Sequence, residues 1–229
     1  MSGRVLGVDA CKYGWVGIVL DRGDVTAHFA PAIVDLVARA EADGGLAVVA
    51  IDIPIGLPDA GQRQADRAAR QVVGRRWPSV FMTPVRSALE AEDHASAVRV
   101  NQRLAGAGVS IQAFSLRTKI FEVDRWARKA THHLVEIHPE VSFARMAGAP
   151  LADSKTTWSG AQRRRDLLFA QGIRLVGDLG SAGTLARVDD ILDAAAAAWS
   201  ARRVAQGAAI SLPDPAEVYS DGLPCAIWA

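Results

Sequence analysis

Three acidic side chains stand where strand-like segments of this 229-residue chain end. Asp9 closes the apolar run RVLGVDA, Asp52 closes LAVVAID, and Glu136 lies in HHLVEIHPE. If these strands run parallel in one open sheet, their carboxyl ends meet at the edge where functional groups gather. The prolines that follow Asp52 and Glu136 turn the backbone away and leave each carboxylate on the rim. The pattern predicts a carboxylate cluster.

A second group of acids opens a helix that is rich in alanine. In VDDILDAAAAAWSARRV, Asp189, Asp190 and Asp193 precede five consecutive alanines. Alanine is the best helix former and the smallest side chain that still packs, so this helix can lie close against a sheet. The spacings i, i+3 and i, i+4 place the three acids on one helix face. Asp189 is expected to cap the helix, Asp193 lies beyond capping reach and is expected in the cluster, and for Asp190 both roles stay open.

Such a cluster predicts a metal site. Several carboxylates within a few ångström raise one another's pKa and cannot all stay ionised without a cation. Hard divalent ions prefer oxygen ligands, and two ions about 4 Å apart can clamp the attacking and leaving oxygens of a phosphodiester. We expect Mg²⁺ or Mn²⁺ to be held by four aspartates: Asp9, Asp52, Asp190 and Asp193. Glu136 is expected to act as a further ligand or as the base for the attacking water.

The elements that would position these acids follow from the hydrophobic pattern. RVLGVDA, WVGIVL and VTAHFA are separated by short turns, which indicates an antiparallel meander of three strands. A helix over PAIVDLVARAEADGG comes next, and LAVVAID then has the continuous apolar character of a parallel strand. HHLVEIHPE predicts a fifth strand, and a helix is expected over SGAQRRRDLLFAQG. The tail DPAEVYSDGLPCAIWA is predicted to be a surface segment whose last apolar residues dock on the body.

Residues 57–131 have a different character, rich in Arg, Gln and Ala with helical periodicity. We predict that they form a mostly helical insertion in a single domain over residues 1–229, whose core comprises residues 4–56 and 132–229. The predicted fold class is α/β, with a mixed five-stranded sheet flanked by helices. Three of its strands form the antiparallel meander and two run parallel.

The composition sets limits on function. Half of the residues are hydrophobic, 22% are charged and the net charge is +1, which is typical of a globular protein without strong non-specific affinity for nucleic acid. The N-terminus has no signal-peptide pattern, and no apolar run reaches the ~18 residues needed to span a bilayer. The two cysteines, Cys11 and Cys225, fit no metal-binding spacing. We expect a cytoplasmic protein with reduced thiols and no membrane association.

Five stretches resemble a known family: GVDACKYGWVGIVL, AIDIPIGLP, SLRTKIFEVD, EIHPEVSF and DDILDAAAAAWSARR. Together they are similar to the domain of unknown function 429 family, whose members are described as predicted RNase H-like nucleases. The resemblance implies the RNase H-like fold and an acidic metal centre at Asp9, Asp52 and either Asp190 or Asp193. The DxxDA arrangement from Asp190 is similar to the corresponding helix of the resolvase branch. Glu136, on the fifth strand, is not where RNase H itself carries its glutamate.

Binding of a phosphate also needs cations. Lys119 in SLRTKI and Lys155 in DSKTTWSG are the preferred candidates, and Arg75 in GRRWPSVFMTPVR is a further one. The same segments offer Arg76, Arg86 and Arg117. Each of these side chains taken alone is also compatible with a solvated surface charge. His138, two residues after Glu136, is a candidate for a substrate contact or proton relay, or for a structural histidine in the HPE turn.

Three functions are compatible with these patterns. The leading hypothesis is a metal-dependent nuclease or phosphodiesterase that acts on DNA or RNA. A catalytically inert module of the same fold, binding nucleic acid or a protein partner, is the alternative. Nucleotide binding of the actin or sugar-kinase type is less favoured, because those proteins carry two such domains and this chain has room for one. The chain also lacks a P-loop motif.

Overall fold

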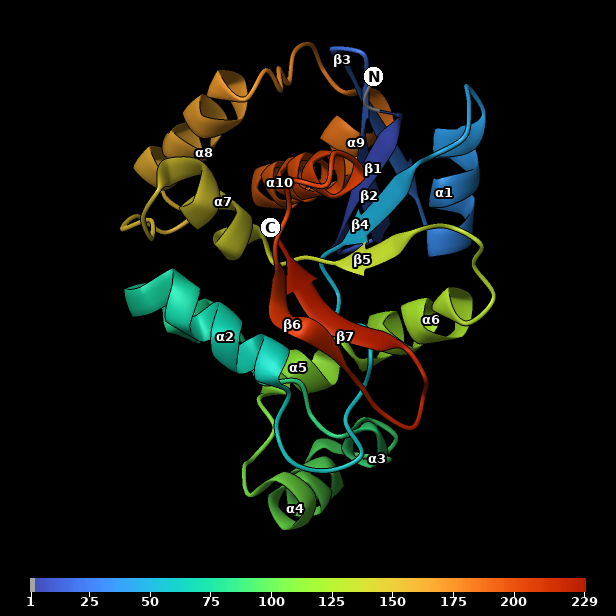
Figure 1. The fold of residues 1–229 in the computed structure, drawn as a ribbon, viewed down its shortest axis with the longest axis vertical. Helices are drawn as coiled ribbons and strands as arrows, with labels where there is room; N and C mark the ends of the chain where they lie inside the picture. Colours follow the sequence, from blue (N-terminus) through green and yellow to red (C-terminus); the bar gives the residue numbers. More distant parts are fainter. Residues whose placement is uncertain (1–2) are drawn as a thin grey trace.

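The chain begins with the predicted antiparallel meander. In the computed structural model, which describes residues 3–229, β1 (Val5–Cys11), β2 (Gly14–Asp21) and β3 (Asp24–Ala30) pair in sequence (Figure 1). The turn between β2 and β3 contains Gly23 with φ +105°, a conformation that glycine adopts without steric cost. The meander prediction is therefore confirmed.

Two parallel strands continue the sheet on the other side of β1. Helix α1 (Ile33–Glu41) leads into β4 (Val48–Ile51), which pairs in parallel with β1, and β5 (Leu134–Glu136) pairs in parallel with β4. All four residues of β4 are buried, as expected for a parallel strand that is covered on both faces. Because β1, β4 and β5 point the same way, their carboxyl ends lie at one edge of the sheet.

Within residues 3–229 the sheet has seven strands, so the prediction of five was wrong. The tail forms β6 (Ser211–Val218) and β7 (Pro224–Trp228), an antiparallel pair in which β7 runs parallel to β5. The strand order is β3-β2-β1-β4-β5-β7-β6. Pro213 and Pro215 lie within β6. Prolines argue against a central strand but are tolerated at an edge, and the local sequence did not indicate that this segment reaches one.

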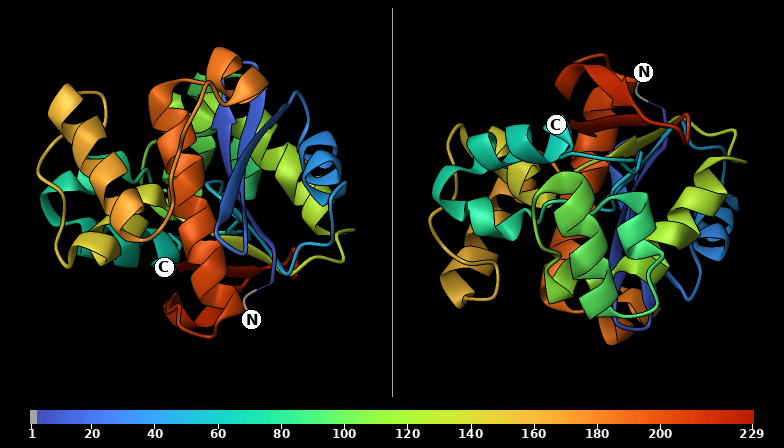
Figure 2. Two further views of the ribbon diagram at one scale, coloured as in Figure 1. Left: turned by 90° about the horizontal axis from the view of Figure 1, so that it is seen from above. Right: turned by 90° about the horizontal axis from the view of Figure 1, so that it is seen from below.

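Helices cover both faces of the sheet (Figure 2). One face buries its apolar residues against α7 (Pro139–Ala147), α8 (Trp158–Ala170), α9 (Gly180–Leu185) and α10 (Val188–Ala205). The other face packs against α1 and α6 (Arg117–Ala127). The fold is therefore α/β with a mixed sheet between two helical layers. Among residues 3–229, no helix is both long enough and apolar enough to cross a membrane.

Residues 57–131 connect β4 to β5 and are mostly helical. They form α2 (Gln64–Val73), the 3₁₀ helix η1 (Gly74–Ser79), α3 (Arg86–Leu89), α4 (His94–Ala105), α5 (Ile111–Ser115) and α6. Helices α3 to α5 bury a small apolar cluster of their own, below the sheet in the view of Figure 1. Helix α2 packs instead on apolar residues of α7 and β7. The insertion thus lies against the core at the side where β4 and β5 end.

Helix α10 crosses β1 with almost no space between the two backbones. Residues Ala194–Ala198 are all fully buried. Opposite them lies Gly7 of β1, where an added Cβ would be 1.9 Å from the backbone nitrogen of Ala198 and 2.3 Å from the carbonyl oxygen of Ala194. Glycine on the strand and alanine on the helix are what permit this approach. The contact fixes the first turns of α10 beside the carboxyl end of β1.

Candidate metal centre

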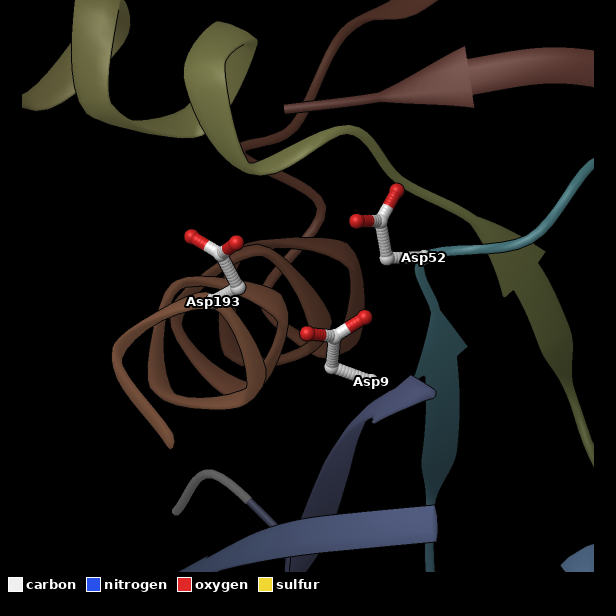
Figure 3. A group of neighbouring side chains, drawn as sticks. All are labelled: Asp9, Asp52 and Asp193. Atoms are coloured by element: carbon white, nitrogen blue, oxygen red, sulfur yellow. The ribbon is translucent and has the colours of Figure 1, made fainter. Parts of the chain in front are cut away.

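Three of the predicted acids meet at the carboxyl edge of the sheet (Figure 3). Asp9 lies on β1, Asp52 follows β4 directly, and Asp193 lies in the second turn of α10. The backbone N–H of Asp52 donates to the carbonyl of Val8 at 3.0 Å, which holds Asp52 beside Asp9. One carboxylate oxygen from each aspartate lies within 4.8 Å of the others. Three hard oxygen ligands at this spacing could hold a divalent cation.

The carboxyls of Asp9 and Asp193 are buried and that of Asp52 is half-buried, and this loss of contact with water raises their pKa values. Asp9 is 7% exposed and Asp193 is 1% exposed. Burial raises the pKa of Asp52 and that of Asp193 to about 7, although Lys155 opposes the rise in both. Burial, together with the charges of Asp52 and Asp193, raises the pKa of Asp9 well above its ordinary value. In the absence of a cation the cluster therefore retains protons that isolated aspartates would release.

Lys155 is the basic group inside the cluster. Its ammonium donates to Oδ2 of Asp193 and lies 3.9 Å from Oδ2 of Asp189. Burial lowers the pKa of Lys155, but Asp193, Asp9 and Asp52 together raise it well above its usual range. One ammonium cannot neutralise three carboxylates, so the ionised cluster keeps a net negative charge.

The second oxygen of Asp193 supplies an independent indication of a ligand. Asp193 Oδ1 is shielded from solvent and has no hydrogen-bond partner among residues 3–229. A buried acceptor without a partner costs about 1–3 kcal/mol, and more when it is charged. A cation bound between the three carboxylates would remove that cost. The donor set therefore fits a divalent metal ion.

The acidic group lies in a pocket of about 320 Å³ between the edge of the sheet and the insertion. Asp9, Asp52 and Asp193 form one part of its lining. The insertion contributes a second set of residues, namely Asp66, Arg76, Ser79, Val80, Phe81, Thr83, Gln112 and Leu116. A substrate bound in this pocket would contact both parts of the chain.

Two further predicted acids line the pocket but lie outside the group of three. Asp190 accepts a hydrogen bond from the backbone N–H of Arg187 at 3.0 Å and so caps α10. Glu136 accepts one from the Arg63 guanidinium at 2.6 Å and one from the backbone N–H of Ile55 at 2.7 Å. Both oxygens of Glu136 are thus engaged. Its predicted action as ligand or base would have to use the remaining lone pair of one of these oxygens.

Of the predicted phosphate-binding residues Lys119, Lys155 and Arg75, only Lys155 lines the pocket. Lys155 lines the pocket, whereas Lys119 lies 3.8 Å from Glu122 and over the ring of Trp15, outside the pocket lining. Arg75 is exposed on η1 and is also outside that lining, which its neighbour Arg76 enters. Sequence spacing alone could not separate these adjacent arginines.

His138 lines the pocket at the N-terminus of α7. Its Nδ1 is shielded and has no hydrogen-bond partner among the described residues. Burial lowers the pKa of the imidazole, which favours its neutral form. The predicted contact between His138 and a substrate stays a prediction, and the position of His138 in the pocket lining is compatible with it.

Three buried polar residues of the pocket were not predicted from the sequence: Asp66, Thr83 and Glu140. Glu140 receives a hydrogen bond from Arg164 at 2.6 Å, and its charge contributes to the raised pKa of Asp52. Its position after Pro139 at the start of a helix was a usable signal. The sequence contains no comparable signal for Asp66 and Thr83, because both resemble the other polar residues of the insertion.

The pKa shifts predict how stability depends on pH. The folded protein keeps protons that the unfolded chain releases above about pH 3.8, so this stabilisation is full below that pH and is lost as the pH rises through about 7. Asp52→Asn removes one of the titrating groups. In buffer containing a chelator, we expect the fall in unfolding free energy between about pH 5 and 8 to be about 2 kcal/mol smaller in Asp52→Asn than in the native protein. Chemical denaturation at both pH values measures this, and parallel profiles would contradict it.

A protein family matches most of the chain. The family described as "Protein of unknown function (DUF429)" matches residues 7–218, a range that includes Asp9, Asp52 and Asp193. No curated protein and no solved structure matches the chain.

Proposed function

The chain belongs to the DUF429 family of proteins of unknown function, and from its acidic centre we propose that it is a divalent-metal-dependent nuclease, a phosphodiesterase with an RNase H-like fold. One observation carries the proposal. Oxygens of Asp9, Asp52 and Asp193, from three separate elements, lie within 4.8 Å of one another, and one oxygen of Asp193 is buried without a partner.

The topology supports the RNase H-like part of the proposal. Three antiparallel strands, a helix and a parallel strand follow one another in the order β1, β2, β3, α1, β4. This is the order that the family resemblance implies. The acids also occupy the implied places, on β1, after β4 and near the start of α10, the last helix of the described residues.

In the proposed mechanism, Asp9, Asp52 and Asp193 would hold Mg²⁺ or Mn²⁺. Asp190 uses Oδ2 in its capping bond, so its Oδ1 would be the oxygen available as a further ligand. A metal held there would supply Lewis acidity and lower the pKa of a bound water. Lys155 lies among the carboxylates and binds a non-bridging oxygen of the scissile phosphate. Glu136, held by Arg63, positions the loop after β4 through the backbone N–H of Ile55.

The second candidate is an inert binding module of the same fold. The ion pair between Lys155 and Asp193 favours it, because this contact already offsets part of the charge that a metal would neutralise. The two candidates differ in their dependence on metal. Binding of nucleic acid by an inert module would be indifferent to a chelator.

Metal titration tests the site itself. We expect Mn²⁺ at a hundred times its dissociation constant to stabilise the native protein by about 2.7 kcal/mol, since it binds only the folded state. Asp52→Asn should abolish this stabilisation. Asp43→Asn is the matched control, because Asp43 has a side chain that is 78% exposed and lies outside the pocket lining. Thermal unfolding with and without Mn²⁺ is the measurement, and equal metal stabilisation in all three proteins would exclude this site.

Chelation tests the activity. The native protein with Mg²⁺ or Mn²⁺ should cleave DNA or RNA oligonucleotides, and excess chelator should stop cleavage that fresh metal restores. Gel analysis of end-labelled oligonucleotides follows the reaction. Metal binding without any cleavage, together with binding of nucleic acid that the chelator leaves unchanged, would favour the inert module.

A further inference from the structure

The insertion brings a distinct set of polar groups into the pocket of the acidic centre. Arg76, Ser79 and Thr83 all come from the segment between α2 and α3. Two hydrogen bonds hold this segment on α2. Arg70 Nε donates to the carbonyl of Val80 at 2.8 Å, and the backbone N–H of Thr83 donates to Asp66 Oδ2 at 2.7 Å. The segment is therefore fixed by contacts that leave the side chains of Arg76 and Thr83 unused.

Both of these side chains have donors without acceptors. Arg76 Nε is shielded from solvent, and within residues 3–229 its guanidinium makes neither a hydrogen bond nor an ion pair. Thr83 is 4% exposed, and its Oγ1 has no partner in the same part of the chain. An unsatisfied buried donor costs about 1–3 kcal/mol. Two such donors in one pocket indicate that an oxygen-rich anionic group belongs there.

Phosphate fits these donors and the acidic centre together. An arginine binds phosphate oxygens through strong charge-assisted hydrogen bonds, and a threonine hydroxyl can add another. Carboxylates in the same pocket would repel a bare anion, but not one whose other oxygens are bound to divalent metal. Donors on the insertion and a metal on the carboxylates would thus bind one phosphate ester from two sides.

The size of the pocket restricts the substrate further. A volume of about 320 Å³ is at the lower end of the range for small-molecule sites. Since Asp9 and Asp193 are buried, a scissile phosphate must enter the pocket to reach them. A base-paired strand would have to give up pairing to do so, as in enzymes that act on an extruded nucleotide.

We propose that Arg76 and Thr83 bind a phosphate of the substrate and that the pocket admits an unpaired nucleotide rather than a base-paired strand. This inference rests on the proposed nuclease function and names its substrate class. Arg76 then determines affinity for the substrate, and the metal centre is assembled without it.

Adenosine 5′-monophosphate, which contains no phosphodiester bond to cleave, is the binding probe in the presence of Mn²⁺. By calorimetry, Arg76→Met should weaken its binding about 10- to 100-fold, as expected for the loss of charge-assisted hydrogen bonds. Thr83→Val should weaken it about 2- to 10-fold. Arg75→Met is the matched control, since Arg75 is the adjacent exposed arginine outside the pocket lining, and should change binding less than about twofold. Stabilisation by Mn²⁺ alone should be the same in all four proteins.

The restriction to unpaired nucleotides is tested by cleavage of a short single-stranded oligonucleotide. Its rate is compared with that of the same sequence in a blunt duplex. We expect at least about tenfold faster cleavage of the single strand, because unpairing costs a few kcal/mol. Equal rates would overturn the restriction to unpaired nucleotides. Equal loss of nucleotide binding in Arg75→Met and Arg76→Met would overturn the phosphate site while leaving the nuclease function in place. A native protein that cleaves nothing but binds the nucleotide through Arg76 would keep the phosphate site and remove the nuclease function.

Discussion

Replacing Asp9 or Asp52 by asparagine should reduce metal-dependent phosphodiester cleavage at least about 100-fold. Changes to residues that only orient metal ligands already cost about 10–100-fold in affinity or activity, so loss of a ligand should cost no less. Asparagine keeps the size of the side chain and removes the charge that holds the cation. The measurement is the initial rate of oligonucleotide cleavage at saturating Mn²⁺, with Asp43→Asn as the control that keeps native activity.

A loss of activity through misfolding can be separated from this effect. Burial raises the pKa of Asp52 to about 7, so at pH 8 the native protein carries a poorly solvated negative charge at this position. Asparagine carries no charge there. The variant should therefore unfold at the same temperature as the native protein, or at a higher one, in buffer with chelator at that pH. Undiminished cleavage by an Asp9→Asn, Asp52→Asn double variant would exclude the acidic centre as the catalytic site.

Gly7→Ala should destabilise the protein by at least about 3 kcal/mol, the upper end of the cost of overpacking a core. The added methyl would lie 1.9 Å from the backbone nitrogen of Ala198, and two backbones cannot rearrange as a flexible side chain can. For a chain of this length, that loss lowers the melting temperature by about 6–12 °C. Thermal and chemical unfolding measure the effect.

Gly7→Ala should also affect the acidic centre, because the packing of α10 on β1 positions Asp193. Displacement of α10 from β1 moves Asp193 away from Asp9, so we expect Gly7→Ala to bind Mn²⁺ more weakly than the native protein does. Gly45→Ala and Gly108→Ala are matched controls, because an added Cβ meets no atom within 4 Å at either position. If Gly7→Ala is as stable as these two controls, the backbones of α10 and β1 are not in close contact.

Much of the core and of the acidic centre follows from local sequence. A meander needs only short turns and period-two patterning, and an apolar run that stops at an acid places that acid at a strand end. Asp9 and Asp52 were predicted in this way. Asp193 followed from its place in the second turn of a helix whose alanine face had to pack closely. Each of these inferences depends on residues within a few positions of one another.

The remaining features depend on partners that lie far away in the sequence. Glu136 ends a strand as Asp52 does, yet Arg63, 73 positions earlier, binds its carboxylate. The residues of β7 were recognised as apolar, but only the position next to β5 made them a strand of the sheet. Arg75 and Arg76 are equivalent in sequence, and the direction of one short helix decides which of them enters the pocket. The sequence by itself determined where the acids of the centre stand along the chain. The tertiary structure decided which side chains face them, because burial, ion pairing and pocket shape are set by contacts between distant segments.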